Sequence, residues 1–325
     1  MVFHMLRRMI GDDLFYQSLR KFYKEKIWQQ ASWKDIQKIF EETGKMDLAW
    51  FFEQWVNQAG APFIELGKTE VEKSNDGWLT KVEIVQTCPQ TILGEGNPYR
   101  LFLPIHLELD DGNFDITAQV KEKNNIVSVH TNSQPKRIHI DPQCDIFRRL
   151  HLEEIPPTID LVLGDADKVF VYPTCGENNS QAAYKKLAEF LADGNAIVKS
   201  DAEIMETDLT QKSLFILGGL TENKLAKIFL DNLPDGFSLG KDSFTAGKTT
   251  YNNKNNALLV TFKNSKNKKK SIALFSCLNS GTIKTVGAKI PHYGKYSYLV
   301  FAEEKNIDKG TFAVIQSPLQ QYLKN

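Results

Sequence analysis

The sequence predicts a multidomain protein with a helical bundle fragment, then an antiparallel β-sandwich, then an α/β domain with an open sheet. Apolar residues recur at helical spacing as far as residue 60, and they alternate with polar residues from there to about residue 150. Beyond that point, short apolar runs typical of buried strands alternate with helical segments. The length of 325 residues agrees with more than one compact domain.

Residues 1–60 predict four helices, which we interpret as the helical C-terminal end of a larger domain. The first ends at Gly11, the third begins at the N-cap Ser32 with Asp35 three positions later, and the fourth begins at Asp47. Trp50 and Trp55 recur at helical spacing, so a role in the core is favoured over an aromatic binding face. The apolar faces of the four helices include Phe3, Leu6, Met9, Phe15, Phe22, Tyr23, Phe51, Phe52 and Trp55.

These apolar side chains cannot all turn inward in a bundle this small, because a short bundle has more surface than its core can hide. Exposed apolar surface favours association over solvation. We therefore expect self-association through residues 1–60.

Residues 61–150 predict a small antiparallel β-sandwich. The clearest strand is at residues 101–109, where five apolar residues alternate with polar ones or proline. Turn signals at residues 75–77, 110–113 and 124–125 separate the strands, and the last strand is expected at 137–141. Strands that bury one face need a second sheet to cover it.

Residues 151–325 predict an α/β domain after a proline-containing linker at 153–157. Strands are expected at 169–172, 196–198 and 214–217, with helices after the first and the last of them. Three more strands are expected at 257–262, 271–277 and 298–301. This order is typical of an open α/β sheet.

Charge and composition exclude several classes of protein. The 40 basic and 40 acidic side chains cancel, so no global field attracts nucleic acid or an anionic membrane, and we expect neither as a partner. No apolar run is long enough to span a bilayer, and the N-terminal residues lack the features of a signal peptide. We therefore expect a soluble protein, and the sequence leaves its compartment unknown.

The search for metal ligands gives no site. None of the six histidines is followed by glutamate, so H-E-x-x-H is absent. His130 and His139 would meet only if their strands were neighbours, and two ligands without a third are weak evidence. The four cysteines form no C-x-x-C pair and are interpreted as isolated, mostly buried thiols: Cys88, Cys144, Cys175 and Cys277.

No catalytic or cofactor-binding residue is predicted either. Gly247, Lys248 and Thr249 resemble the end of a phosphate loop, but Asp242 replaces its first glycine and no helix follows. The lysines at 266 and 268–270 lie between two apolar strands and are expected in a solvated hairpin turn. G-x-S-x-G is absent.

Two loops occupy the usual position of a ligand crevice. Residues 174–180 and 218–221 each follow a predicted strand and precede a predicted helix, where open α/β sheets bind ligands. Plain strand-to-helix turns capped by Ser180 or Thr221 are the favoured interpretation. A small-molecule site in the α/β domain remains an alternative.

Three segments resemble zinc aminopeptidases of the aminopeptidase N and leukotriene hydrolase family, which are gluzincins. Residues 47–62, DLAWFFEQWVNQAGAP, resemble the segment that closes the catalytic domain of that family. Residues 2–12, VFHMLRRMIGD, resemble the helix after its catalytic tyrosine, and DP at 141–142 with FRRL at 147–150 resembles the end of its sandwich domain. The resemblance covers residues 1–150. The prediction for residues 151–325 rests only on the order of expected strands and helices.

The resemblance implies a C-terminal, non-catalytic portion of a bacterial-type enzyme. The family's H-E-x-x-H helix, third zinc ligand, G-x-M-E-N strand and catalytic tyrosine all belong upstream of Met1, so none is assigned to a residue here. Zinc and peptide substrates are expected of the full-length parent, whose missing catalytic region becomes a second candidate partner for residues 1–60. The chain alone is expected to be inactive. The alternative is a stand-alone binding or assembly protein.

Overall fold

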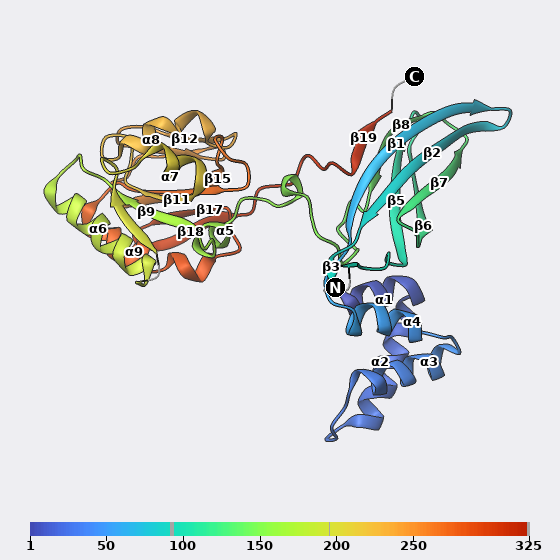
Figure 1. Ribbon diagram of the computed structural model, residues 1–325. Helices are drawn as coiled ribbons and strands as arrows, with labels where there is room; N and C mark the ends of the chain where they lie inside the picture. Colours follow the sequence, from blue (N-terminus) through green and yellow to red (C-terminus); the bar gives the residue numbers. More distant parts are fainter. Residues whose placement is uncertain (92–93, 195, 324–325) are drawn as a thin grey trace. The chain divides into compact units, whose positions relative to one another are not determined.

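The computed structural model describes residues 1–91, 94–194 and 196–323. The chain forms two compact units, one of Met1–His151 with the segment from Gln316 onward and one of Leu152–Ile315. The multidomain order of helices, antiparallel sheets and an α/β sheet is confirmed (Figure 1). The expected boundaries differ at the C-terminus, because the segment from Gln316 belongs with the first unit and not with the α/β domain.

The first unit begins with the expected helices. Ser32 and Asp35 form the predicted capping box, with the Asp35 amide donating to Ser32 Oγ at 3.3 Å and the Ser32 amide donating to Asp35 Oδ2 at 2.8 Å. The last helix continues into a π-helical turn, Glu53–Asn57, before strand β1. The helices are α1 (Val2–Ile10), α2 (Asp12–Lys26), α3 (Trp33–Gly44) and α4 (Ala49–Phe52).

Some of the residues expected in the helical core are buried and others are exposed. Leu6, Phe15, Phe51 and Phe52 are buried in the core of the first unit. Tyr23 was expected on a buried face but is 66% exposed. The remaining apolar residues, Phe3, Met9, Phe22 and Trp55, are only partly covered.

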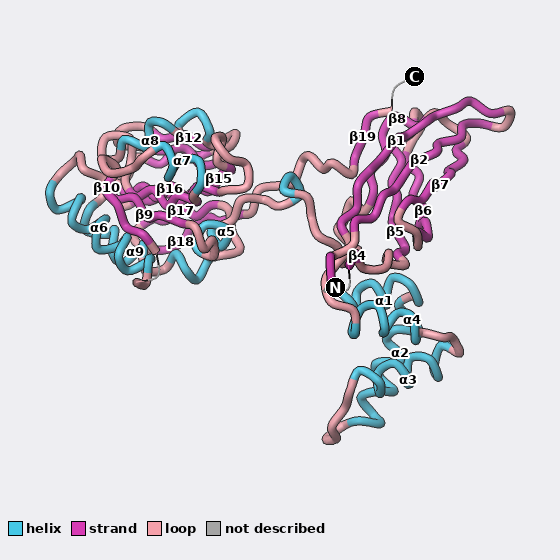
Figure 2. Tube along the Cα trace, in the orientation of Figure 1, coloured by secondary structure: helices cyan, strands magenta, loops and turns pink. Residues whose placement is uncertain are grey.

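Two antiparallel sheets follow the helices and enclose the rest of this core (Figure 2). Along β5 the apolar positions are buried in alternation, as predicted. One sheet has the order β1-β2-β7 and the other the order β19-β8-β5-β6, with a short β3-β4 hairpin beside them. The strands are β1 (Phe63–Ser74), β2 (Gly77–Thr87), β3 (Gln90–Thr91), β4 (Gly94–Glu95), β5 (Leu101–Leu109), β6 (Asn113–Val120), β7 (Asn124–Thr131), β8 (Pro135–Ile140) and β19 (Gln320–Tyr322).

One local expectation in the sandwich is wrong, and one pairing that the sequence left weak does not form. Residues 124–125 were expected in a turn, but β7 begins at Asn124, and Asn125 Oδ1 accepts from the amides of Lys121 and Glu122 in the turn before it. His130 and His139 do not meet, because β7 and β8 belong to different sheets.

The second unit has a seven-stranded mixed sheet in the order β10-β9-β11-β16-β15-β17-β18. Its first four strands are parallel and the others antiparallel. These strands are β9 (Lys168–Tyr172), β10 (Ile197–Ser200), β11 (Ser213–Leu217), β15 (Asn256–Lys263), β16 (Ser271–Cys277), β17 (Tyr298–Ala302) and β18 (Lys305–Gly310).

Helices cover both faces of this sheet. One apolar cluster joins the sheet to α5 (Ile159–Leu163), α6 (Asn178–Ala192) and α9 (Ile283–Gly287). The other joins it to α7 (Glu206–Gln211), α8 (Lys224–Ile228) and the small sheet of β12 (Phe237–Leu239), β13 (Phe244–Ala246) and β14 (Thr249–Tyr251). Figure 1 shows α6 and α9 on the side of the sheet opposite α7 and α8.

The predicted linker is part of the second unit. Glu154 is only 5% exposed, in a 3-10 turn spanning Leu152–Glu154. The carbonyl of Pro157 accepts a hydrogen bond from Thr261 Oγ1 at 2.8 Å. These contacts fasten the segment expected as a stiff linker to the α/β unit, which begins at Leu152.

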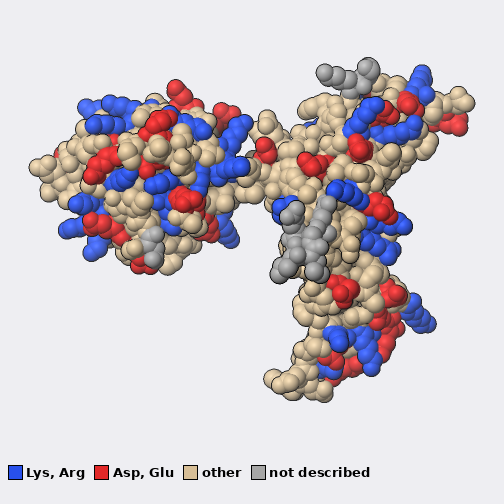
Figure 3. Space-filling model, in the orientation of Figure 1, with Lys and Arg blue, Asp and Glu red and all other residues tan. Residues whose placement is uncertain are grey.

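Charge is distributed without a dominant sign, as Figure 3 shows with basic and acidic side chains interspersed on the visible face of each unit. Among the helices that the structure describes, none combines the length and the apolar character needed to cross a bilayer.

Candidate functional site

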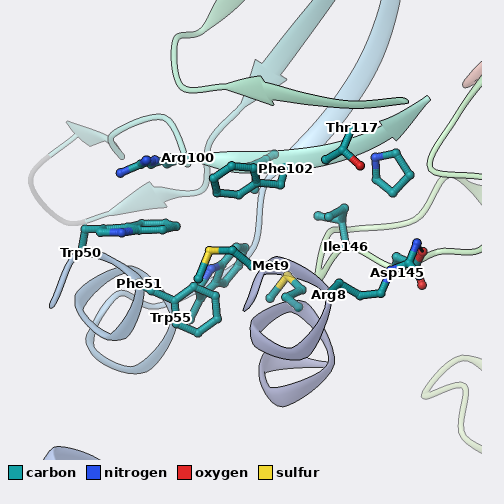
Figure 4. Close-up of a pocket in the computed structure, with 13 residues that line it drawn as sticks. Arg8, Met9, Trp50, Phe51, Trp55, Arg100, Phe102, Thr117, Asp145 and Ile146 are labelled. Carbon is teal, nitrogen blue, oxygen red and sulfur yellow. Dashed lines mark ion pairs between the residues drawn. The ribbon is translucent and has the colours of Figure 1, made fainter. Parts of the chain in front are cut away.

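The first candidate site is a cavity of about 280 Å³ where α1 and α4 meet β5 and β6 (Figure 4). We call it the helix–sandwich cavity. Six of its 13 lining residues are aromatic or methionine, and the Arg100 guanidinium carbon lies 4.2 Å from the centre of the Trp50 ring. The residues that line it are Met5, Arg8, Met9, Trp50, Phe51, Trp55, Arg100, Leu101, Phe102, Pro104, Thr117, Asp145 and Ile146.

The helices that form this cavity are fastened to the sandwich by specific bonds. Gln54 in the π-helical turn pairs with the Arg100 backbone, accepting from its amide at 2.7 Å and donating to its carbonyl at 3.1 Å. The Trp55 ring lies 5.2 Å from the buried ring of Tyr99. Burial raises the pKa of Tyr99, so its phenol stays neutral and donates to the carbonyl of Ala59 at 3.4 Å. Trp55, which was expected in the core, therefore also joins the helices to the sandwich.

Charged groups at the mouth of the cavity are already paired. Asp145 lies 2.6 Å from His4 Nε2 and 3.4 Å from an Arg8 guanidinium nitrogen. Such a wall can hold an apolar group beside a cation, and it presents no acid–base pair suited to catalysis. Among the described residues, no group of three histidine, cysteine, aspartate or glutamate side chains is arranged to hold a metal ion.

The second candidate site is a cavity of about 320 Å³ at the carboxyl ends of β9, β11 and β16. We call it the strand-end crevice. The two loops that the sequence placed at a ligand crevice do meet here, through Gly176 and Ser180 on one side and Gly219 and Thr221 on the other. The remaining lining residues are Glu177, Glu222, Lys241, Asp242, Asn252, Lys254, Ser276, Cys277, Leu278 and Ser280.

Glu222 joins the two loops of the strand-end crevice. Ser180 Oγ donates a short hydrogen bond to one oxygen of its carboxylate, and the amide of Gly219 donates to the other at 2.9 Å. Asn223 extends the connection by donating to the carbonyls of Leu217 at 2.8 Å and Val171 at 3.3 Å. These bonds hold together the ends of two neighbouring strands.

Two buried groups lie behind this clamp. The Tyr184 hydroxyl accepts from the amide of Cys277 at 3.0 Å, and burial raises the pKa of Tyr184 well above its usual value. Burial also raises the pKa of the Cys277 thiol, which contacts Thr282 Oγ1 at 3.0 Å. Both groups are therefore protonated at neutral pH, and Cys277 is not an activated nucleophile.

Sequence reasoning assigned the wrong caps at this site. Glu177 occupies the N-cap of α6, and Asn223 caps α8 by accepting from the amide of Leu225 at 2.9 Å. Ser180 is used by Glu222, and Thr221 is exposed. Glu222 and Ser276 were missed, because no local pattern marks a glutamate or serine whose partners are distant in the sequence.

The other sequence features take ordinary structural roles. Gly247 and Lys248 form the turn between β13 and β14, and the lysine run forms the predicted turn between β15 and β16. Two of these lysines make ion pairs, Lys266 with Glu206 at 2.8 Å and Lys270 with Asp165 at 3.0 Å. The cysteines are less uniformly buried than expected, since Cys88 and Cys277 are buried, Cys144 is intermediate and Cys175 is exposed.

Comparison with known proteins relates part of the chain to a peptidase. No family model matches the sequence. Aminopeptidase N of Lactococcus lactis subsp. lactis is 28% identical over 61 residues, which is 19% of this chain and 7% of that protein. The match therefore spans a small fraction of the length of that relative.

Two solved structures show weak likenesses to this chain. Legionella pneumophila aminopeptidase A in complex with aspartic acid aligns with 47% of this chain and 18% of its own, at 15% identity and a TM-score of 0.35. A hypothetical protein from Pyrococcus horikoshii OT3 aligns with 26% of this chain and 76% of its own, at 17% identity and a TM-score of 0.16. Likenesses at this level carry no functional inference.

Proposed function

We propose that this chain is the C-terminal, non-catalytic portion of a zinc metallo-aminopeptidase of the aminopeptidase N and leukotriene hydrolase family. The observation that carries the proposal is the segment at residues 47–62, whose sequence resembles the end of that family's catalytic domain and which here runs from α4 through the π-helical turn towards β1. The 61-residue similarity to Aminopeptidase N supports it. The parent enzyme would remove N-terminal residues from peptides by metal-activated water.

In this proposal the chain acts as a support. Gln54, Trp55 and Met5 attach the helices to the sandwich, the last through a hydrogen bond from the Phe147 amide to Met5 Sδ at 3.3 Å. A helical end held in this way would position the catalytic region that precedes it. The helix–sandwich cavity lies at that joint.

The residues described here do not fit the zinc of such an enzyme. His4 and Asp145 form a two-residue pair that an arginine shares, and His106 pairs with Asp115 at 2.6 Å without a third ligand. A catalytic zinc needs three protein ligands. The metal and the chemistry it supplies are therefore assigned to the parent's catalytic region, and no step is assigned to this chain.

The first test measures zinc and activity in the purified chain. We expect no stoichiometric zinc by elemental analysis and no release of product from aminoacyl-nitroanilide substrates. Stoichiometric zinc together with chelator-sensitive hydrolysis would contradict the proposal.

The second test reads the coding sequence upstream of Met1. A reading frame that continues in phase through H-E-x-x-H is the expected result. A stop codon directly before Met1 would contradict it and would favour a stand-alone binding or assembly protein.

A further inference from the structure

The strand-end crevice lies where the strand order of the α/β sheet reverses. β9 has β10 on one side and β11 on the other, and the chain passes from β9 through α6 to β10 before it returns through α7 to β11. The loops after β9 and β11 therefore leave in opposite directions and open a gap between them. Open α/β sheets bind ligands at this point.

The crevice floor contains a buried hydroxyl that is free to donate. Ser276 lines the crevice and is only 4% exposed, and within the described ranges its hydroxyl has no hydrogen-bond partner. A Cβ atom at Gly219 would come within 2.8 Å of Ser276 Oγ, so glycine at that position keeps the hydroxyl open. The hydroxyl faces the open crevice, where a water molecule or a ligand can accept its hydrogen bond.

The start of α6 supplies further donors. This helix has 15 residues, no acidic residue in its first turn and no side-chain hydrogen bond at its N-cap. No N-cap side chain bonds its first amides, and the Ser180 hydroxyl in its first turn is bonded to Glu222. The positive end of the helix dipole lies at the same place.

Three carboxylates line the crevice, and Glu222 is the least exposed of them. Both oxygens of Glu222 already receive hydrogen bonds, from Ser180 and from the Gly219 amide. Lys241 and Lys254 stand on the rim, where Asp242 and Glu177 are also exposed and screened by solvent. The bonds from Ser180 and Gly219 hold the Glu222 carboxylate in place, and Ser276 remains able to donate to a ligand.

We propose that the strand-end crevice binds a small molecule through an anionic group, a phosphate or a carboxylate. The group accepts a hydrogen bond from Ser276 beside the start of α6, where Glu177 and Ser180 line the crevice, and the exposed Lys254 adds a screened attraction. This inference goes beyond the proposed function and does not depend on it, because the α/β unit lies outside the segment that resembles the peptidases.

The test titrates the full chain separately with inorganic phosphate and with acetate, followed by NMR at constant ionic strength. We expect saturable binding of one of them, and the stronger one identifies the group. Ser276→Ala should weaken that binding about tenfold, as expected for a hydrogen bond to a charged acceptor. Lys254→Gln, at an exposed turn position, should weaken it by a smaller factor and reduce its salt dependence.

Two matched variants serve as controls. Ser271→Ala removes a buried serine at the opposite end of β16, and Lys248→Gln removes an exposed lysine in the β13–β14 turn. Both should bind as the unmodified chain does. Absence of saturable binding of either anion at millimolar concentration, or equal binding by Ser276→Ala and Ser271→Ala, would overturn the proposal.

Discussion

At the scale of single residues, Asp208 in α7 holds a buried charge between two lysines. Its Oδ2 accepts from Lys199 at 2.7 Å and from the Met205 amide at 3.1 Å, and its Oδ1 lies 3.0 Å from Lys212 Nζ. Burial by itself would raise the pKa of Asp208, but the hydrogen bonds from Lys199, Met205 and Lys212 outweigh it and lower the pKa to about 2.

This lowered pKa predicts how stability depends on pH. The ionised form of Asp208 stabilises the folded state above the ordinary value of 3.8, and that contribution is lost as the pH falls from 3.8 towards 2. Asp208→Asn should lower the free energy of unfolding at neutral pH by about 2 kcal/mol. In urea unfolding followed by circular dichroism, the difference from the unmodified chain should shrink as the solution is acidified through this range.

Asp242→Asn is the matched control, because Asp242 is exposed in the same unit. Its free energy of unfolding should follow that of the unmodified chain at every pH. A destabilisation by Asp208→Asn that is as large in acid as at neutral pH would contradict the prediction.

At the scale of elements, the corner between α2 and α3 exposes apolar side chains. Trp28 is 96% exposed with a φ of 63°, and Ile27 and Tyr23 beside it are 38% and 66% exposed. Bulky residues rarely adopt this φ, and the exposed indole adds apolar surface that association would cover. We propose that this corner makes the association expected of residues 1–60.

Trp28→Asn tests that association. Asparagine adopts the left-handed conformation more readily than tryptophan, so the fold should be retained while the apolar contact is lost. Light scattering at increasing concentration should show assembly of the unmodified chain and a shift towards monomer for Trp28→Asn. Ile126→Thr removes a side chain that is 76% exposed on β7 and should leave assembly unchanged. An unmodified chain that stays monomeric at high concentration would contradict the prediction.

At the scale of the whole molecule, the chain leaves the first unit at His151 and returns to it at Gln316. The returning segment places β19 against β8 and buries Leu319 completely. The amide of Ile140 donates to the Leu319 carbonyl at 2.8 Å. The sandwich is therefore completed by residues that follow the entire α/β unit in the sequence.

Leu319→Ala should destabilise the first unit alone, by about 3 kcal/mol for a fully buried leucine. All five tryptophans lie between residues 28 and 78, so tryptophan fluorescence reports the unfolding of that unit. Its transition should move to lower denaturant while the α/β transition seen by circular dichroism stays in place. Tyr322→Ala, at a position 69% exposed on the same strand, should change little. Equal movement of both transitions would mean that the two units unfold together.

The sequence by itself determined the elements and the faces they bury. The alternation along β5 and the capping box of Ser32 and Asp35 were readable because each depends on residues within a few positions of one another. The order of helices, sandwich and α/β sheet followed from changes in the spacing of apolar residues along the chain. The loops at the strand-end crevice were located because each lies between an apolar strand run and a helical segment.

Only the tertiary structure decided which distant residues meet. Ser180 and Glu222 are 42 positions apart, and β19 pairs with β8 across the whole α/β unit. The local spacing of apolar residues specifies which face of an element is apolar, but it does not specify which other element covers that face. The clamp of the strand-end crevice, the open hydroxyl of Ser276 and the C-terminal strand of the sandwich all depend on that second choice, which long-range burial and hydrogen bonding make.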